Sequence, residues 1–210
     1  MDQRELERLW AFFAEKQGLS DHQTIQFKRY FDLLNQWKDR VNLTAIDDLE
    51  KILAYHFEDS LALGQFVDMH SLSITADVGT GGGFPGLPLK IKYPHLQMIL
   101  IEVNQKKRDF LACVVQELDL KEVIIYPHDW RTFIRKTDFG IDLFCSRASL
   151  HPDELLRIYK PSCVYQKAQM VYWASDQWTP QAKEKEFIQR EERYIVGQRT
   201  RRLIFLHLTN

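Results

Sequence analysis

The stretch that decides the fold is ITADVGTGGGFPG, at residues 74–86. Five residues with strand character, Ile74–Val78, precede glycines at positions 79, 81, 82, 83 and 86. Glycine permits tight turns and lets the backbone come close to a ligand, which a side chain would obstruct. Pro85 has a fixed φ and no N–H, which suits the first turn of a helix. The segment predicts a strand, a tight turn and a helix, with a ligand at the carboxyl end of the strand.

Beyond residue 71, short apolar runs alternate with helical patterns, which is typical of βαβ units on a mainly parallel sheet. The last two runs are separated only by residues 197–202, which predicts an antiparallel pair that closes the sheet. We therefore expect an α/β fold with a seven-stranded, mostly parallel sheet. The predicted strands are Ile74–Val78, Met98–Val103, Val123–Pro127, Ile141–Cys145, Cys163–Gln166, Arg193–Val196 and Leu203–His207. The predicted helices cover 85–92, 105–118, 152–159 and 180–190.

The segment before this sheet is helical by its pattern, because apolar residues recur at helical spacing from Glu5 to about Phe66. Ser20 and Gln23 have the spacing of a capping box, which begins a helix near residue 21. A further helix is expected from about Asp48 to Val67. The chain is thus expected to have an N-terminal helical layer over 1–70 and a ligand-binding domain over 71–210.

The composition is that of an ordinary globular protein, with 45% hydrophobic and 27% charged residues among 210. The formal net charge of -1 excludes binding to nucleic acid by bulk charge, so such a partner needs a local basic patch. The three cysteines have no metal-ligand spacing and fit a reducing cytoplasm. The polar start predicts no signal peptide, and no apolar run approaches the roughly 18 residues of a membrane span. We expect a soluble, cytoplasmic monomer without a metal.

An acidic residue at the end of the second predicted strand narrows the choice of ligand. Glu102 lies nineteen residues past Gly83, where a carboxylate can accept hydrogen bonds from both hydroxyls of a ribose. A nucleoside-containing cofactor follows from the two features together. Residues 81–86 satisfy GxGxxG, the pattern of a dinucleotide site in an NAD-dependent oxidoreductase. The frame that starts at Asp77, with glycines at 79, 81 and 83, is commoner in methyltransferases that use S-adenosylmethionine, and we favour that interpretation. A glycine-rich turn with no ligand is the minority interpretation.

Several spaced blocks give the chain a resemblance to a known family. The blocks are Asn42-Leu43-Thr44-Ala45, His56-Phe57-x-Asp59-Ser60, Asp77 to Gly86 followed by Leu87-Pro88-Leu89, and Ser146-Arg147-Ala148, with Glu102, Lys107 and Phe110-Leu111 between the last two. In these positions the sequence resembles the 16S ribosomal RNA guanine-N7 methyltransferases called RsmG or GidB, from about Trp37 to Lys167. The resemblance implies a Rossmann-like class I methyltransferase fold and S-adenosylmethionine as cofactor. It implies a guanine in the 530 loop of 16S ribosomal RNA, in the small ribosomal subunit, as methyl acceptor.

The resemblance also assigns the cofactor site. It places the cofactor against Gly79 and Phe84, the pair Trp130-Arg131 and Arg147, beside the glycine segment with Asp77, Gly81 and Gly83 and the carboxylate of Glu102. The chain departs from the family at Asp129-Trp130-Arg131, where the usual order is Arg-x-Glu. Asp129 can still accept a hydrogen from the adenine amino group. Because these charges are exchanged, two interpretations stay open. The chain is a divergent member of the family, or it is a non-catalytic paralogue that binds RNA or cofactor.

The predicted substrate residues come from three parts of the chain. Arg147 is the candidate active-site cation, because it lies just past the fourth predicted strand and strand ends face the crevice. His56, Asp59 and Ser60 lie at i, i+3 and i+4 and share a helix face just after Asn42, as a wall of the RNA pocket. Lys167, just past the fifth predicted strand, and the cluster Arg199-Thr200-Arg201-Arg202, in the last predicted turn, are candidates to contact RNA, as is Lys106-Lys107-Arg108. Guanine N7 carries a lone pair and no proton, so no general base is required.

Overall fold

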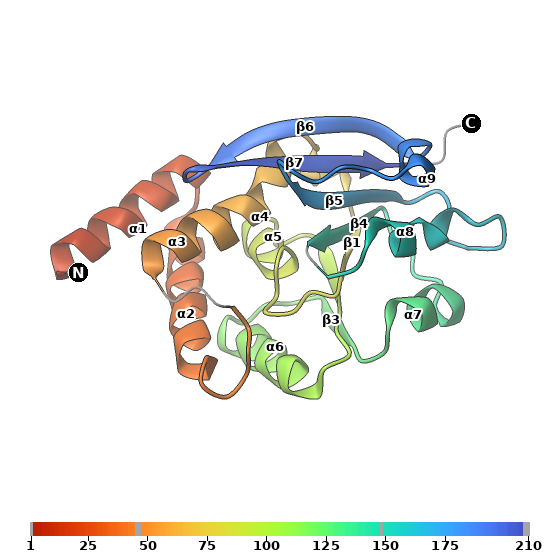
Figure 1. Cartoon of the computed structure of the whole chain (residues 1–210). Helices are drawn as coiled ribbons and strands as arrows, with labels where there is room; N and C mark the ends of the chain where they lie inside the picture. Colours follow the sequence, from red (N-terminus) through yellow and green to blue (C-terminus); the bar gives the residue numbers. More distant parts are fainter. Residues whose placement is uncertain (1, 45–47, 148, 208–210) are drawn as a thin grey trace.

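In the computed structural model, which describes residues 2–44, 48–147 and 149–207, the centre of the molecule is one sheet with the strand order β3-β2-β1-β4-β5-β7-β6. Strands β1 to β5 run parallel to one another, and β7 is antiparallel to both β5 and β6. The strands are β1 (Ile74–Val78), β2 (Gln97–Ile101), β3 (Val123–Tyr126), β4 (Leu143–Arg147), β5 (Gln169–Ser175), β6 (Ile188–Val196) and β7 (Arg199–Leu206). This confirms the predicted seven-stranded, mostly parallel sheet with an antiparallel final pair (Figure 1).

Helices cover both faces of the sheet (Figure 1). Before β1 lie α1 (Gln3–Gln17), α2 (Asp21–Trp37), α3 (Leu49–Ile52), the π-helical η1 (Leu53–Glu58), α4 (Asp59–Leu61) and the 3-10 segments η2 (Ala62–Gln65) and η3 (Met69–Ser71). Within the sheet region lie α5 (Gly86–Lys92), α6 (Gln105–Glu117), α7 (Trp130–Lys136), α8 (Pro152–Leu155), η4 (Leu156–Tyr159) and α9 (Ala182–Lys185). The capping box that Ser20 and Gln23 predict is present at the start of α2.

Alternation along the strands divides the apolar core into two layers. Leu203 and Phe205 of β7 belong to a cluster with α1, α2, α5 and α6, whereas Ile204 and Leu206 belong to a cluster with α7 and α8. Successive strand residues point to opposite faces, so each strand serves both layers. The N-terminal helices are therefore packed into the same apolar layer as α5 and α6. The division of the chain near residue 70 stays a prediction.

Two predicted elements are wrong. Residues Cys163–Gln166 form turns, and the fifth strand is Gln169–Ser175, which pairs with β4 over five residues. The predicted helix 180–190 is limited to α9, because β6 begins at Ile188 and pairs with β7 along the sheet edge. Lys167 consequently precedes β5 instead of following it. Helix α7 was not predicted.

The parallel strands bring their carboxyl ends to one edge of the sheet. Gly79 follows β1, Glu102 follows β2, and Arg147 ends β4. Asp129 lies three residues beyond the end of β3 at Tyr126. In an open α/β sheet the ligand crevice lies outside these ends. The predicted site residues that follow strand ends thus lie together at the carboxyl ends of the parallel strands. Lys167 lies at the amino end of β5, on the opposite side of the sheet from them.

Candidate functional site

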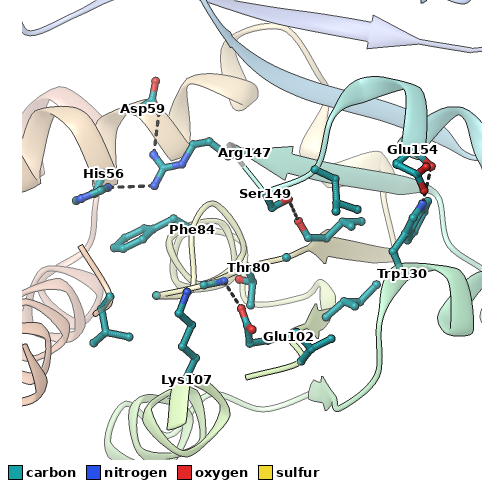
Figure 2. A pocket seen from close by; sticks show the side chains of 18 of the residues that line it. His56, Asp59, Thr80, Phe84, Glu102, Lys107, Trp130, Arg147, Ser149 and Glu154 are labelled. Carbon is teal, nitrogen blue, oxygen red and sulfur yellow. Dashed lines mark hydrogen bonds and ion pairs between the residues drawn. The ribbon is translucent and has the colours of Figure 1, made fainter. Parts of the chain in front are cut away.

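A cleft of about 890 Å³ opens at the carboxyl ends of the parallel strands. Figure 2 shows side chains from α4, the glycine turn, α6, α7, β4 and α8 around it. Predicted site residues that line the cleft are His56, Asp59, Gly79, Gly81, Phe84, Glu102, Asp129, Trp130, Arg131, Arg147, Arg199 and Arg201. Five others, Asn42, Ser60, Asp77, Gly83 and Lys167, are not among its lining residues. Ala45 and Ala148, which belong to the quoted sequence blocks, lie outside the described residues.

Asp77 fixes the turn formed by residues 79–86, called here the glycine turn. Its Oδ2 accepts hydrogen bonds from the Thr80 hydroxyl at 2.6 Å and from the Gly86 N–H at 2.8 Å. The carboxyl group is fully buried, its Oδ1 has no partner among the described residues, and burial raises the pKa of Asp77 to about 6. A buried carboxylate with two bonds to one turn fixes the shape of that turn. Asp77 therefore supports the turn, and its expected contact with the cofactor stays a prediction.

Tyr30 of α2 supports the same turn from the helical layer. Its buried hydroxyl donates to the Gly82 carbonyl, and its ring stacks on Phe84 with 5.5 Å between centroids. A Cβ at Gly83, where φ is +97°, would lie 2.5 Å from the Tyr30 hydroxyl oxygen. Gly83 is therefore required for close packing against α2. The sequence offered only the helical spacing of Tyr30, which indicates a core residue.

Ser149 supports the turn at Gly79 and was not predicted. Its hydroxyl donates to the Val78 carbonyl at 2.6 Å, and a Cβ at Gly79 would lie 2.4 Å from the Ser149 Cβ. Gly79 has φ +66°, which L side chains rarely adopt. The only sequence signal for Ser149 was its place two residues after Arg147.

The acidic end of the cleft contains Glu102 and the start of α7. Glu102 accepts from the Gly81 N–H at 3.0 Å and from the Asn104 N–H at 2.8 Å, so its carboxylate is held at the turn. Each of its oxygens keeps a second lone pair for a ligand hydroxyl. Asp129 caps α7 by accepting from the Thr132 N–H at 2.7 Å, and this bond lowers the pKa of Asp129.

The next two residues of α7 are anchored by α8. The Trp130 indole donates to the Glu154 carbonyl at 2.9 Å, and Arg131 pairs with the Glu154 carboxylate at 2.9 Å. The Arg157 and Arg131 guanidinium groups lower the pKa of Glu154 to about 2. The exchanged charges of Asp129 and Arg131 therefore each have a local partner, a helix N-terminus for the acid and Glu154 for the base. Glu154 was not predicted from the sequence.

Arg147 is the centre of the opposite end. Its Nη1 donates to Asp59 at 2.9 Å, and its Nη2 lies 3.0 Å from His56 Nδ1 (Figure 2). Its Nη1 also donates to the Tyr55 carbonyl at 3.1 Å. The guanidinium also lies over the Phe84 ring, 5.1 Å from its centroid. The side chain is 10% exposed, so Arg147 is a fixed cation at the strand end, as its place in the sequence predicts.

The contact with Arg147 determines the tautomer of His56. A guanidinium can only donate, so His56 Nδ1 must accept and its ring proton lies on Nε2, which is 2.6 Å from the Thr44 hydroxyl. Burial and the Arg147 charge lower the pKa of His56 to about 3. The ring stacks on Phe84 with 4.5 Å between centroids. His56 is thus a neutral orienting group.

Asp59 links this end of the cleft to the last two strands. Its side chain is 3% exposed and accepts from Arg147, from Arg201 at 3.2 Å and from the Tyr194 hydroxyl at 2.6 Å. A buried carboxylate with three donors is well compensated. Asn42 and Ser60 were expected to form part of a wall of the RNA pocket, but neither lines the cleft. Ser60 is buried and bonds back to the His56 carbonyl, and Asn42 is exposed outside the lining.

The basic cluster 199–202 lies in a strand, which corrects the expected turn. The turn between β6 and β7 consists of Gly197 and Gln198 only, and Arg199 begins β7. Lys107, from the other basic cluster, lines the cleft on the side of Glu102. Lys167 lies just before β5, at the end of the strands opposite to the cleft. The expectation that it contacts RNA assumed a position after the fifth strand, and this assumption is wrong.

Across residues 2–44, 48–147 and 149–207, no group of three or more His, Cys, Asp or Glu side chains has a geometry that could hold a metal ion. Within the same ranges, no helix has the length and apolarity that crossing a membrane requires.

Comparison with known families and proteins gives one consistent match. A family model described as rRNA small subunit methyltransferase G, GidB, matches residues 23–204. A protein of that name from Lachnoclostridium phytofermentans is 38% identical over 145 residues, which are 68% of this chain and 60% of the relative. One from Geobacillus sp. is 42% identical over 134 residues, 62% of this chain and 56% of the relative. The matched part is thus less than two thirds of the length of these relatives.

Solved structures agree on the fold. A SAM dependent methyltransferase from Aquifex aeolicus matches with a TM-score of 0.53 and 19% identity, over 76% of this chain and 94% of that one. The M1A22 tRNA methyltransferase TrmK of B. subtilis matches with a TM-score of 0.56 and 9% identity, over 73% of this chain and 66% of that one. These likenesses confirm the Rossmann-like class I methyltransferase fold.

Proposed function

Because the chain belongs to the rRNA small subunit methyltransferase G family, we propose that it binds S-adenosylmethionine and methylates the RNA of the small ribosomal subunit. The acceptor we propose, from the sequence blocks that resemble the family, is N7 of a guanine in 16S ribosomal RNA. The enzyme would act in the cytoplasm as a monomer. An NAD-dependent oxidoreductase or an idle paralogue gains no support from the relatives, whose names are those of methyltransferases.

The observation that carries the proposal is the cradle formed by the glycine turn and Glu102. A Cβ at Gly81 would meet only the Gly79 carbonyl oxygen, at 3.9 Å, so the space beside the turn is open to a ligand. Glu102 reaches this space from β2 with lone pairs suited to ribose hydroxyls. The residues present thus fit a nucleoside. Gly79, Gly81, Phe84 and Glu102 would hold the cofactor, with Asp129, Trp130 and Arg131 toward its adenine.

The cofactor, when bound, supplies an electrophilic methyl group on a sulfonium. Arg147 has five N–H donors, and three are engaged by Asp59, Tyr55 and His56. We assign the two remaining donors to the cofactor or the guanine, which makes Arg147 the proposed catalytic residue. Because the guanidinium is fixed before the ligands arrive, no reorganisation is needed at the moment of transfer.

The protonation state of the site suits an acceptor that needs no base. Guanine N7 presents a lone pair without losing a proton, and His56, the histidine nearest to Arg147 in the cleft, already uses Nδ1 as an acceptor for it. With its pKa near 3, His56 stays neutral in the physiological range. The cleft would act by aligning acceptor and methyl group and by excluding water.

The test has a binding step and a product step. Calorimetry should give binding of S-adenosylhomocysteine and none of NADH, and tight binding of NADH alone would overturn the cofactor assignment. Purified protein with tritiated S-adenosylmethionine and either naked 16S RNA or small subunits should then give labelled N7-methylguanine. In a strain without the gene, mass spectrometry of 16S RNA nucleosides should detect a loss of N7-methylguanine. An unchanged amount there, together with no transfer in vitro, would reject the reaction.

A further inference from the structure

Resting on the proposed RNA substrate, we propose that Arg199, stacked on Tyr55 at the tip of the β6–β7 hairpin, contacts a phosphate of the RNA. The neighbouring cations Arg201 and Arg202 serve the fold. The basic cluster 199–202 thus contains one RNA contact, and its position in the strand determines which residue it is.

Strand alternation separates the three arginines. Arg199 and Arg201 lie on the same face of β7 as Leu203 and Phe205, the face toward Asp59 and the cleft. Arg202 lies on the other face, where its guanidinium bonds to the Ser175 and Trp178 carbonyls and to Glu191. Arg202 therefore points away from the cleft and is 6% exposed.

Arg201 is committed to a buried carboxylate. Its Nε lies 3.2 Å from Asp59 Oδ1 and its Nη2 lies 3.5 Å from Oδ2. Its side chain is 22% exposed, and Asp59 is 3% exposed. Turning Arg201 toward an RNA phosphate would remove a partner from a buried charge, which is costly. Arg201 is thus held in the wall.

Arg199 has the opposite properties. It is exposed, it lines the mouth of the cleft, and it pairs with no carboxylate among the residues that the structure describes. Its guanidinium carbon lies 4.1 Å from the centroid of the Tyr55 ring. The ring is itself fixed by the hairpin turn, because a Cβ at Gly197 would lie 2.9 Å from Tyr55 Cε1. A stacked guanidinium loses little conformational freedom when it binds a phosphate and keeps its N–H edges free to donate.

The distribution of charge supports a polyanion at this end of the cleft. Arg147, Arg199 and Arg201 line this end of the cleft together with Asp59, whose carboxylate pairs with Arg147 and Arg201 but, among the described residues, not with Arg199. The other end, beside the proposed cofactor site, is lined by both signs of charge, with the acids Glu102, Asp129 and Glu154 next to the cations Lys107 and Arg131. Arginine contacts to phosphates position an RNA without reading its sequence. The hairpin tip therefore supplies the local basic contact that a chain with net charge -1 requires.

The test compares Arg199→Gln with Arg193→Gln. Arg193 is exposed on the neighbouring strand, is paired in register with Arg202, and lies on the face away from the cleft, so the second variant loses the same charge elsewhere. Binding to 16S RNA transcribed in vitro is measured by filter retention across a range of salt concentrations. We expect Arg199→Gln to weaken binding about tenfold and to reduce the slope of log K against log salt by about 0.7. Arg193→Gln should match the wild type, and calorimetry with S-adenosylhomocysteine should confirm that both variants are folded.

Tyr55 provides a second comparison, because it would act through Arg199 as a positioning residue. Tyr55→Phe keeps the ring and should keep wild-type affinity for RNA, whereas Tyr55→Leu should lose several-fold. Equal affinity and equal salt slope for Arg199→Gln and Arg193→Gln would overturn the proposal, as would absence of RNA binding by the wild type. Methyl transfer that proceeds without dependence on Arg199 would leave the proposed function standing. Binding that depends on Arg199 without methyl transfer would reject the proposed function instead.

Discussion

Replacing Asp59 by asparagine should destabilise the whole chain, because this carboxylate compensates two guanidinium groups. The Asp59 side chain is 3% exposed, that of Arg147 is 10% exposed and that of Arg201 is 22% exposed. Removing one partner of a buried ion pair costs about 3–5 kcal/mol. Asparagine can keep the hydrogen bond from Tyr194, and Arg201 is partly hydrated, so we expect the lower end, about 3 kcal/mol. The amide nitrogen of asparagine is itself a donor, so it cannot replace a carboxylate oxygen as acceptor for the guanidinium groups.

The assay is urea unfolding followed by tryptophan fluorescence, since the Trp173 indole donates to the Asp59 carbonyl at 2.8 Å. With a slope of about 2 kcal/mol per molar urea, a loss of 3 kcal/mol lowers the midpoint by about 1.5 M. Glu7→Gln is the control, because Glu7 pairs with Lys28 at the surface and is 60% exposed. Its midpoint should move by less than about 0.3 M. A shift for Asp59→Asn as small as that of the control, at an unchanged slope, would refute the reasoning.

Three further variants probe the supports of the cleft. Tyr30→Phe loses only the bond to the Gly82 carbonyl, worth about 1 kcal/mol, so calorimetry should give about fivefold weaker binding of S-adenosylhomocysteine; unchanged binding would mean that the turn keeps its shape unaided. Gly79→Ala combines φ +66° with a Cβ 2.4 Å from that of Ser149, so its unfolding free energy should fall by about 2–4 kcal/mol, and adding Ser149→Gly should recover part of it. Folding lowers the pKa of His56 from 6.5 to about 3. Between these two pH values His56 is therefore protonated in the unfolded chain and neutral in the folded chain. The stabilisation is fully present above pH 6.5 and is lost as pH falls toward 3, by up to about 1.4 kcal/mol per pH unit. The stability advantage of the wild type over His56→Phe should thus shrink by about 2 kcal/mol from pH 7.5 to pH 5, and a constant difference would contradict the neutral state of the folded His56.

The parts of the fold that the sequence predicts well are those with local causes. Strand β1 has the predicted bounds Ile74–Val78, and α2 begins at the capping box of Ser20. In both places the residues that fix the conformation are adjacent in sequence. Arg147 at the end of β4 was predictable for the same reason, because a strand end defines its position.

The errors occur where tertiary contacts decide. Cys163–Gln166 is as apolar as a strand, but Tyr165 turns inward, and its hydroxyl lies 2.6 Å from that of Thr137 and accepts from the Phe139 N–H at 3.1 Å. Strand β6 carries charges on its exposed positions because it is the edge of the sheet, and this polar pattern resembles that of a helix. Neither cause is visible in a window of ten residues.

The supports of the candidate site were missed for a similar reason. Ser149 acts through a loop that returns to Gly79, and Tyr194 reaches Asp59 across 135 positions of the chain. A motif identifies residues that follow strand ends, but it carries no information on which side chains fix them. Asp77 shows the converse, since its motif position suggested a ligand contact and its carboxylate is buried beneath the turn.

The bond between Asp59 and Arg201 also has a consequence for biosynthesis. The two residues are 142 positions apart, so a ribosome that adds 5–20 residues per second makes the second roughly 7–28 s after the first. Late in that interval the nascent chain contains the glycine turn and Arg147 but still lacks the strand that completes the wall around Asp59. The wall of the cleft can therefore be completed only after β7 emerges from the exit tunnel, and a polypeptide released before Arg199 would retain the glycine turn without the hairpin that we assign to RNA.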